Sequence, residues 1–115
     1  MKDGKITNAK ITGVSISMAD HGVLTFDVWL ESNEWSCGLG GYIIGNGYLG
    51  ASSFKGSGKG LEAMMMIMDT VGVEKWEDLK GKYVRCIDSV GVTIDEIGNI
   101  IEDKWFNIRE FFEKE

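Results

Sequence analysis

The sequence predicts a small α+β domain, in which an antiparallel sheet of about five or six strands packs against a methionine-rich helix and a short C-terminal helix. Two observations predict this class. The first half of the chain places apolar side chains at every second position between turn-forming clusters, as half-buried strands do. Helical spacing occurs only in short segments of the second half. Because 115 residues provide one hydrophobic core, we expect residues 1–115 to form a single domain.

The first two strands are predicted to form a hairpin. Residues 6–18 alternate apolar and small polar side chains, and Gly13 indicates a bulge because Ile11 falls out of phase with the residues that follow. Residues 19–22 are rich in turn formers, and residues 24–30 then alternate again as a second half-buried strand.

A second hairpin is predicted to follow the first. Residues 31–34 form the next turn, and residues 35–44 form a third strand that several glycines interrupt. Asn46 and Gly47 are typical of a two-residue hairpin turn, so we expect residues 48–53 to return as a fourth strand.

The methionine-rich helix is predicted over residues 61–71, and Gly72 is suited to end it in the left-handed conformation. Helical spacing places several apolar side chains on one face, which we expect to cover the sheet: Leu61, Met64, Met65 and Met68.

Shorter elements are expected in the remainder of the chain: a short helix over residues 74–79, a strand over residues 83–87, and a sixth strand or irregular edge over residues 92–97. The C-terminal helix is predicted to begin at Ile108, because Asn107 and Glu110 match the N-cap and the third helical position of a capping box.

The charge and composition exclude several classes of function. A net charge of −6 opposes direct binding to nucleic acid, which depends on lysines and arginines that neutralise phosphates. The polar N-terminus and the absence of a long apolar run predict a cytosolic protein without a membrane partner. Two cysteines and one histidine, without metal-ligand spacing, predict neither a metal site nor a disulfide framework, and no cofactor is expected.

Two glycine-rich motifs match nucleotide-binding loops in letters but not in context. Residues 45–50 (GNGYLG) fit the dinucleotide fingerprint, yet strand-like residues follow where that motif needs a helix. Residues 56–60 (GSGKG) resemble the end of a phosphate-binding loop, but Gly60 replaces the Ser or Thr that would hold magnesium. The helix start beside Lys59 still offers backbone amides and a positive charge, which suit an anion.

Aromatic and cationic side chains around these loops form the candidate ligand site. Flat rings beside glycines suit planar ligands such as nucleobases, and arginine is the usual partner of phosphate. The predicted ligand-binding residues are Trp35, Tyr42, Asn46, Tyr48, Lys59, Arg85 and Arg109. The alternative is that the rings belong to the core and the arginines to surface ion pairs. No catalytic residue is predicted, because a turn histidine such as His21 beside Asp20 more often stabilises its turn.

Four segments together resemble a family of small proteins from phages and prophages of Firmicutes: MADHGVLTF (18–26), CGLGGY (37–42), MDTVGVEKWEDLKGKYVR (68–85) and IGNIIEDKWF (97–106). In size and layout the chain also resembles the type-one Thoeris anti-defence proteins. The resemblance implies a counter-defence protein of the host cytosol that sequesters a cyclic nucleotide immune signal without cleaving it. It suits a homo-oligomer, because pockets between subunits enclose a ligand that one small chain cannot surround.

A function of a different class is the alternative. An acidic protein can block a host defence enzyme by direct contact, as anti-CRISPR inhibitors do, when its acidic face occupies a basic channel. The carboxylates of residues 74–82 and 101–106 are interspersed with lysines instead of forming one acidic stripe, which favours the ligand-binding function. A nucleotide hydrolase centred on His21 and Asp20 is a third interpretation.

Overall fold

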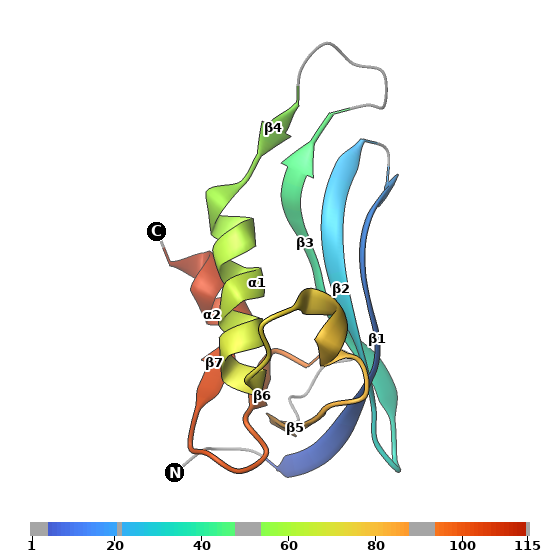
Figure 1. The fold of residues 1–115 in the computed structure, drawn as a ribbon, viewed down its shortest axis with the longest axis vertical. Helices are drawn as coiled ribbons and strands as arrows, with labels where there is room; N and C mark the ends of the chain where they lie inside the picture. The colour runs from blue at the N-terminus through green and yellow to red at the C-terminus, as the bar shows by residue number, and fades with distance from the viewer. Residues whose placement is uncertain (1–4, 21, 48–53, 88–93, 115) are drawn as a thin grey trace.

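The computed structural model describes residues 5–20, 22–47, 54–87 and 94–114. The fold is α+β, as the sequence predicts, and within these residues its sheet has seven strands (Figure 1). The elements in chain order are β1 (Ile6–Asp20), β2 (Val23–Glu31), β3 (Ser36–Asn46), β4 (Lys55–Gly56), α1 (Gly58–Val71), the 3₁₀ helix η1 (Trp76–Leu79), β5 (Tyr83–Ile87), β6 (Glu96–Gly98), β7 (Trp105–Asn107) and α2 (Ile108–Glu113). No helix in the described part of the chain has the length and apolar character needed to cross a membrane.

The strands lie in the order β4-β3-β2-β1-β5-β6-β7, and every neighbouring pair is antiparallel. The long strand β1 joins the two halves of the sheet. It pairs with β2 along most of its length, but it pairs with β5 only between Ile6 and Lys10. The N-terminal hairpins and the C-terminal strands therefore form one sheet through β1.

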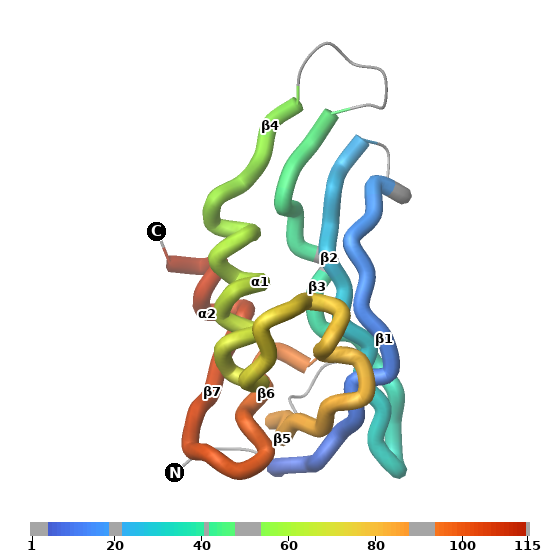
Figure 2. The backbone as a smooth tube through the Cα atoms, viewed as in Figure 1, coloured from blue at the N-terminus to red at the C-terminus, as the bar shows by residue number. Residues whose placement is uncertain are grey.

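Irregularities in the strand pairing bend this sheet. The register of β1 and β2 shifts between Ile11 and Gly13, which confirms the predicted bulge, and β2 and β3 shift register twice. Bulges increase local twist and curvature. The sheet consequently curves around α1, which packs against β3 on one side and against β6 and β7 on the other. Figure 2 shows α1 inside this curve, with α2 beside it.

The face that helix α1 presents to the sheet matches the predicted one only in part, because Met64 is buried and Met68 packs against the core as predicted. Its buried side chains include Ala63, Met64, Ile67 and Thr70, whereas Leu61 and Met65 are 53% and 66% exposed. The physical reason is close packing at the small Gly60, whose position allows the helix backbone to approach β3. The prediction was based on the hydrophobicity of the side chains, which does not indicate that small residues lie on the face in contact with the sheet.

The predicted two-residue turn at Asn46 and Gly47 is wrong. Gly45 and Asn46 pair with Gly56 and Lys55, so the chain returns to β3 only at β4. The predicted strand over residues 48–53 lies outside the described residues.

The remaining elements follow the sequence closely. Gly72 ends α1 with φ of 95°, and Asn107 caps α2 by accepting a hydrogen bond from the Glu110 amide at 2.9 Å. Both caps were predicted, as was β5. The short helix is confined to η1, and β7 was missed because its three residues are too few for a periodic pattern.

Candidate functional site

The structure distributes the predicted ligand residues over separate regions. They are Trp35 before β3, Asn46 at the far end of β3, Arg85 on β5, and Tyr42, Lys59 and Arg109 around α2, while Tyr48 lies outside the described residues. Trp35 and Asn46 lie at opposite ends of β3. The candidate residues therefore do not line one common pocket within a single copy of the chain.

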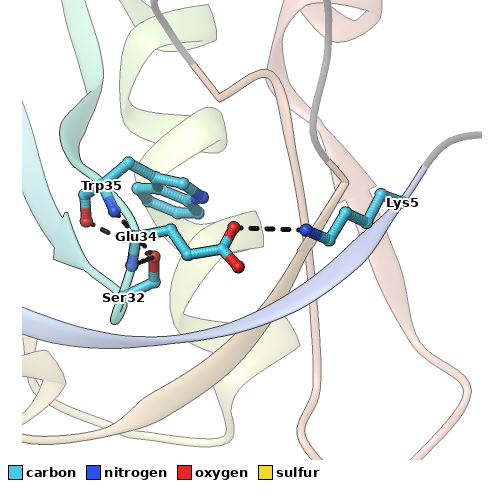
Figure 3. Close-up of polar contacts among 4 residues, drawn as sticks. All are labelled: Lys5, Ser32, Glu34 and Trp35. Carbon is cyan, nitrogen blue, oxygen red and sulfur yellow. Dashed lines mark hydrogen bonds and ion pairs between the residues drawn. The ribbon is translucent and has the colours of Figure 1, made fainter.

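Trp35 anchors the turn between β2 and β3. The Ser32 hydroxyl accepts hydrogen bonds from the amides of Glu34 and Trp35, both at 3.2 Å, and Glu34 forms an ion pair with Lys5 at 3.2 Å (Figure 3). The indole ring packs against the hydrophobic core, and its buried Nε1 finds no acceptor among the described residues. The position of Trp35 is that of a structural anchor.

Arg85 holds the loop between β6 and β7. Its guanidinium donates to the Asn99 and Glu102 carbonyls, each at 2.7 Å, and lies 4.6 Å from the centroid of the Trp105 ring. Two of its donors and one of its faces are therefore occupied by the fold itself.

The other three candidates meet at a group of side chains that we call the α2 cluster: Tyr42, Lys59, Arg109, Phe111 and Phe112. The Tyr42 and Phe112 rings are parallel within 3°, with centroids 4.1 Å apart. Phe111 meets Phe112 edge to face at 5.6 Å, and the Lys59 ammonium lies 5.4 Å from the Phe111 ring. Residues from β3, α1 and α2 thus form a continuous surface of rings flanked by cations.

Carboxylates balance the charge at one side of the α2 cluster. Arg109 contacts Asp95 at 3.6 Å and Glu113 at 3.4 Å, and its side chain stays two-thirds exposed. Burial raises the pKa of the Tyr42 hydroxyl, the Asp95 and Glu113 carboxylates raise it further, and the Arg109 guanidinium opposes them. Tyr42 therefore remains a neutral hydrogen-bonding group at physiological pH.

No family model, curated protein or solved structure matches this chain. The function is therefore inferred from the geometry of the chain itself. The α2 cluster brings together three of the seven predicted ligand residues, Tyr42, Lys59 and Arg109.

The first turn of α1 lies beside the α2 cluster and favours negative charge. Ser57 caps the helix by accepting a hydrogen bond from the Gly60 amide at 3.1 Å, and the turn contains no acidic residue. The amides of Gly58 and Lys59 have no partner among the described residues. The Lys59 ammonium donates to the backbone carbonyl of Lys114. A helix N-terminus with an adjacent ammonium favours an anionic ligand.

Phe111 and Phe112 were not among the predicted ligand residues, although they lie on the predicted C-terminal helix. The capping box supplied the relevant signal, because it fixes where α2 begins and so which side its rings occupy. Nothing in the sequence indicated a depression of about 640 Å³ lined by Gly81, Lys82, Tyr83 and other residues near the end of α1.

The side chains of the α2 cluster are of types that can bind a planar group and a phosphate. Aromatic faces stack on planar groups, and ammonium and guanidinium groups pair with phosphate. Within residues 5–20, 22–47, 54–87 and 94–114, no group of three or more His, Cys, Asp or Glu side chains is placed to hold a metal ion. His21 of the hydrolase interpretation lies outside the described residues.

Proposed function

We propose that this protein is a non-catalytic binding protein that sequesters a phosphate-containing small molecule, specifically a cyclic nucleotide, at the α2 cluster and the first turn of α1. One observation carries the proposal: Tyr42, Lys59 and Arg109 come from distant parts of the chain and meet around the same short helix. The resemblance to phage proteins supplies the biological context, which is counter-defence in the host cytosol.

The phosphate is expected to bind at the start of α1. There the Gly58 and Lys59 amides and the Lys59 ammonium can all donate to it. The ammonium now donates to the carbonyl of Lys114, which is a neutral acceptor. A phosphate oxygen is a stronger acceptor because its hydrogen bonds are charge-assisted. Ligand binding therefore replaces this contact between α1 and the end of the chain.

The base is expected to stack on Tyr42. Phe112 already lies parallel to this ring at 4.1 Å, which is the arrangement that a nucleobase would adopt. Helix α2 is anchored by Ile108, which is 1% exposed, so Arg109 stays in place when the ligand binds. A base that takes the position of the Phe112 ring supplies an equivalent ring and displaces that side chain alone.

The ligand can be identified by thermal denaturation with a panel of cyclic dinucleotides, cyclic trinucleotides and cyclic ADP-ribose isomers. A ligand at about a hundred times its dissociation constant stabilises the folded protein by about 2.7 kcal/mol, so the expected result is a clear rise in Tm. The complex is then heated, and the released ligand is analysed by chromatography. Intact ligand supports sequestration, degraded ligand indicates an enzyme, and no thermal shift with any compound contradicts the proposal.

Two substitutions test the location. Lys59→Ala and Arg109→Ala should each weaken ligand binding by about tenfold or more, because a hydrogen bond to a charged group contributes about 1.5–3 kcal/mol. Lys80→Ala removes an exposed lysine elsewhere on the surface and is the matched control. Isothermal titration calorimetry measures binding, and the Tm of each free variant should stay close to that of the wild type. Equal affinity for all three variants would place the site elsewhere.

A specific observation favours inhibition by direct contact as a second candidate function. Tyr83, Ile100 and Ile101 line the depression near the end of α1 and are 56%, 39% and 86% exposed. Exposed apolar side chains around a depression are typical of protein contacts. In cells that carry a defence system, Ile101→Asp should abolish counter-defence if the protein acts by contact, whereas Lys59→Ala should abolish it if the protein acts by sequestration.

A further inference from the structure

One edge of β1 is open over half of the strand. On the side away from β2, the pairing with β5 ends at Lys10, and Ile11 adds hydrogen bonds to Gly81 and Lys82 at 2.7 and 2.8 Å. Beyond Ile11, no described strand pairs with β1 on this side, although β2 continues along the other. Figure 1 shows this half of β1 at the margin of the sheet.

The backbone of the open edge is directed outward at alternate residues. Ile11 points its amide and carbonyl toward Lys82 and Gly81, away from β2. The bulge shifts the register before Gly13, and beyond it every second residue of β1 again directs its backbone outward. The amides and carbonyls of Val14 and Ile16 therefore also point away from β2. A row of outward amides and carbonyls is a template for another strand.

The side chains of this edge do nothing to prevent such pairing. Residues 12–19 (TGVSISMA) contain no charged residue and no proline, which are the usual means of protecting an edge. Ile16 is 46% exposed, although it lies opposite the fully buried Phe26. The pairing of β1 with β2 is regular between Gly13 and Ser17, with register shifts on either side.

We propose that two copies of this chain pair antiparallel through this edge, with the two-fold axis at Ile16. The pattern Val14-Ser15-Ile16-Ser17-Met18 is self-complementary about its centre. Antiparallel pairing places Ile16 opposite Ile16, Val14 opposite Met18, and Ser15 opposite Ser17 of the second copy. Apolar side chains meet on one face and serine hydroxyls meet on the other, and both arrangements stabilise a strand pair.

Pairing through β1 produces one sheet that runs through both copies, with closed two-fold symmetry. It leaves the α2 cluster uncovered, because α2 and the open edge of β1 lie at opposite sides of the molecule (Figure 1). The interface therefore does not depend on the proposed function. Each copy carries a net charge of −6 while the paired segment is uncharged, so added salt screens the repulsion between copies and tightens the dimer.

Light scattering coupled to gel filtration, over a series of protein concentrations, measures the state of assembly. The wild type should have the mass of a dimer. Ile16→Lys should be monomeric, with a dissociation constant raised by about tenfold or more, because it removes an apolar contact and places like charges opposite each other. Ile43→Lys is the matched control, since Ile43 on β3 is similarly exposed at 52% and lies away from this edge. It should remain dimeric.

A cross-linking variant keeps the test decisive if Ile16→Lys does not fold. Ile16→Cys should form a covalent dimer on mild oxidation, because the two-fold axis brings the two positions within the Cα distance that a disulfide spans. Ile43→Cys and the wild type, oxidised in parallel, should not. A wild type that is monomeric at every concentration would overturn the proposal, as would a dimer that persists in Ile16→Lys.

Discussion

Asn99 joins the end of α1 to the loop between β6 and β7 through one side chain. Its Nδ2 donates to the Thr70 carbonyl at the end of α1, at 3.0 Å, and its Oδ1 accepts from the amides of Ile101 and Glu102, both at 2.9 Å. It therefore satisfies backbone groups that would otherwise lack partners at the helix terminus and in the loop.

Asn99→Ala is expected to destabilise the fold by about 1–2 kcal/mol, because the part-buried Thr70 carbonyl and the exposed Ile101 and Glu102 amides lose their partner at once. Urea denaturation followed by circular dichroism measures the change. Asn8→Ala, at an exposed position on β1, is the matched control and should change stability little. Equal midpoints for the two variants would show that the contacts of Asn99 contribute nothing measurable.

Asp27 is a carboxylate in the middle of the sheet, opposite Ser15 of β1 and Gly40 of β3. Burial raises its pKa above the ordinary value. A raised pKa means that folding favours the protonated form. The stability that this provides is present below the ordinary carboxyl pKa and is lost as the pH rises through the raised value.

Asp27→Asn should therefore raise the Tm at neutral pH and have little effect below about pH 3, where the carboxyl is protonated in both states. Melting curves between these pH values test this. Glu62→Gln, at an exposed position on α1, is the control, and it should not reproduce the pH-dependent gain. A lower Tm for Asp27→Asn at neutral pH would mean that the ionised carboxylate stabilises the fold.

At the scale of elements, the packing of α1 against β3 depends on Gly60. A Cβ placed there would lie 2.5 Å from Ile44 Cγ2 and 2.8 Å from the Ile43 carbonyl oxygen, so the helix would have to move away from the strand. Gly58 lies about half a turn earlier and is exposed, and a Cβ placed on it would meet no described atom within 4 Å.

The two glycines make a matched pair of substitutions. Gly58→Ala should leave stability unchanged or raise it by up to about 1 kcal/mol, because alanine favours the helix more than glycine does. Gly60→Ala should lower stability by about 1–3 kcal/mol despite the same gain in propensity, because it overpacks the contact with β3. Chemical denaturation of both variants measures the difference. Similar stabilities would show that α1 can shift at no cost.

The elements that the sequence predicted well are those with a local signal. Alternation predicts β2, and capping residues predict the start of α2 and the end of α1. The face of α1 was right for Met64 and Met68 but wrong for Leu61 and Met65, because contact between small residues carries no hydrophobic signal. The turn at Asn46 was wrong because its local preference is overridden by the pairing of β3 with Lys55 and Gly56.

At the scale of the whole molecule, the candidate site could be predicted only in part. Tyr42, Lys59 and Arg109 were chosen by residue type, but their meeting depends on the curvature of the sheet around α1, which brings β3 close to the helix that follows β7. That curvature results from several bulges. The alternation of apolar and polar residues along the sequence does not predict their combined effect on the shape of the sheet. Arg85 was chosen on the same grounds as Arg109, yet the fold uses it to hold a loop.

Strand β1 pairs with β2 along most of its length and with β5 at one end, and this arrangement affects the order in which the strands can pair during folding. Strands β1, β2 and β3 follow one another along the chain and can pair early, whereas β5 must find Ile6–Lys10 after α1 has been made, because Ile6 pairs with Ile87. Until β5 arrives, the whole length of β1 is an unpaired edge. The folding chain therefore passes through a stage that is more prone to associate with other copies than the finished molecule is.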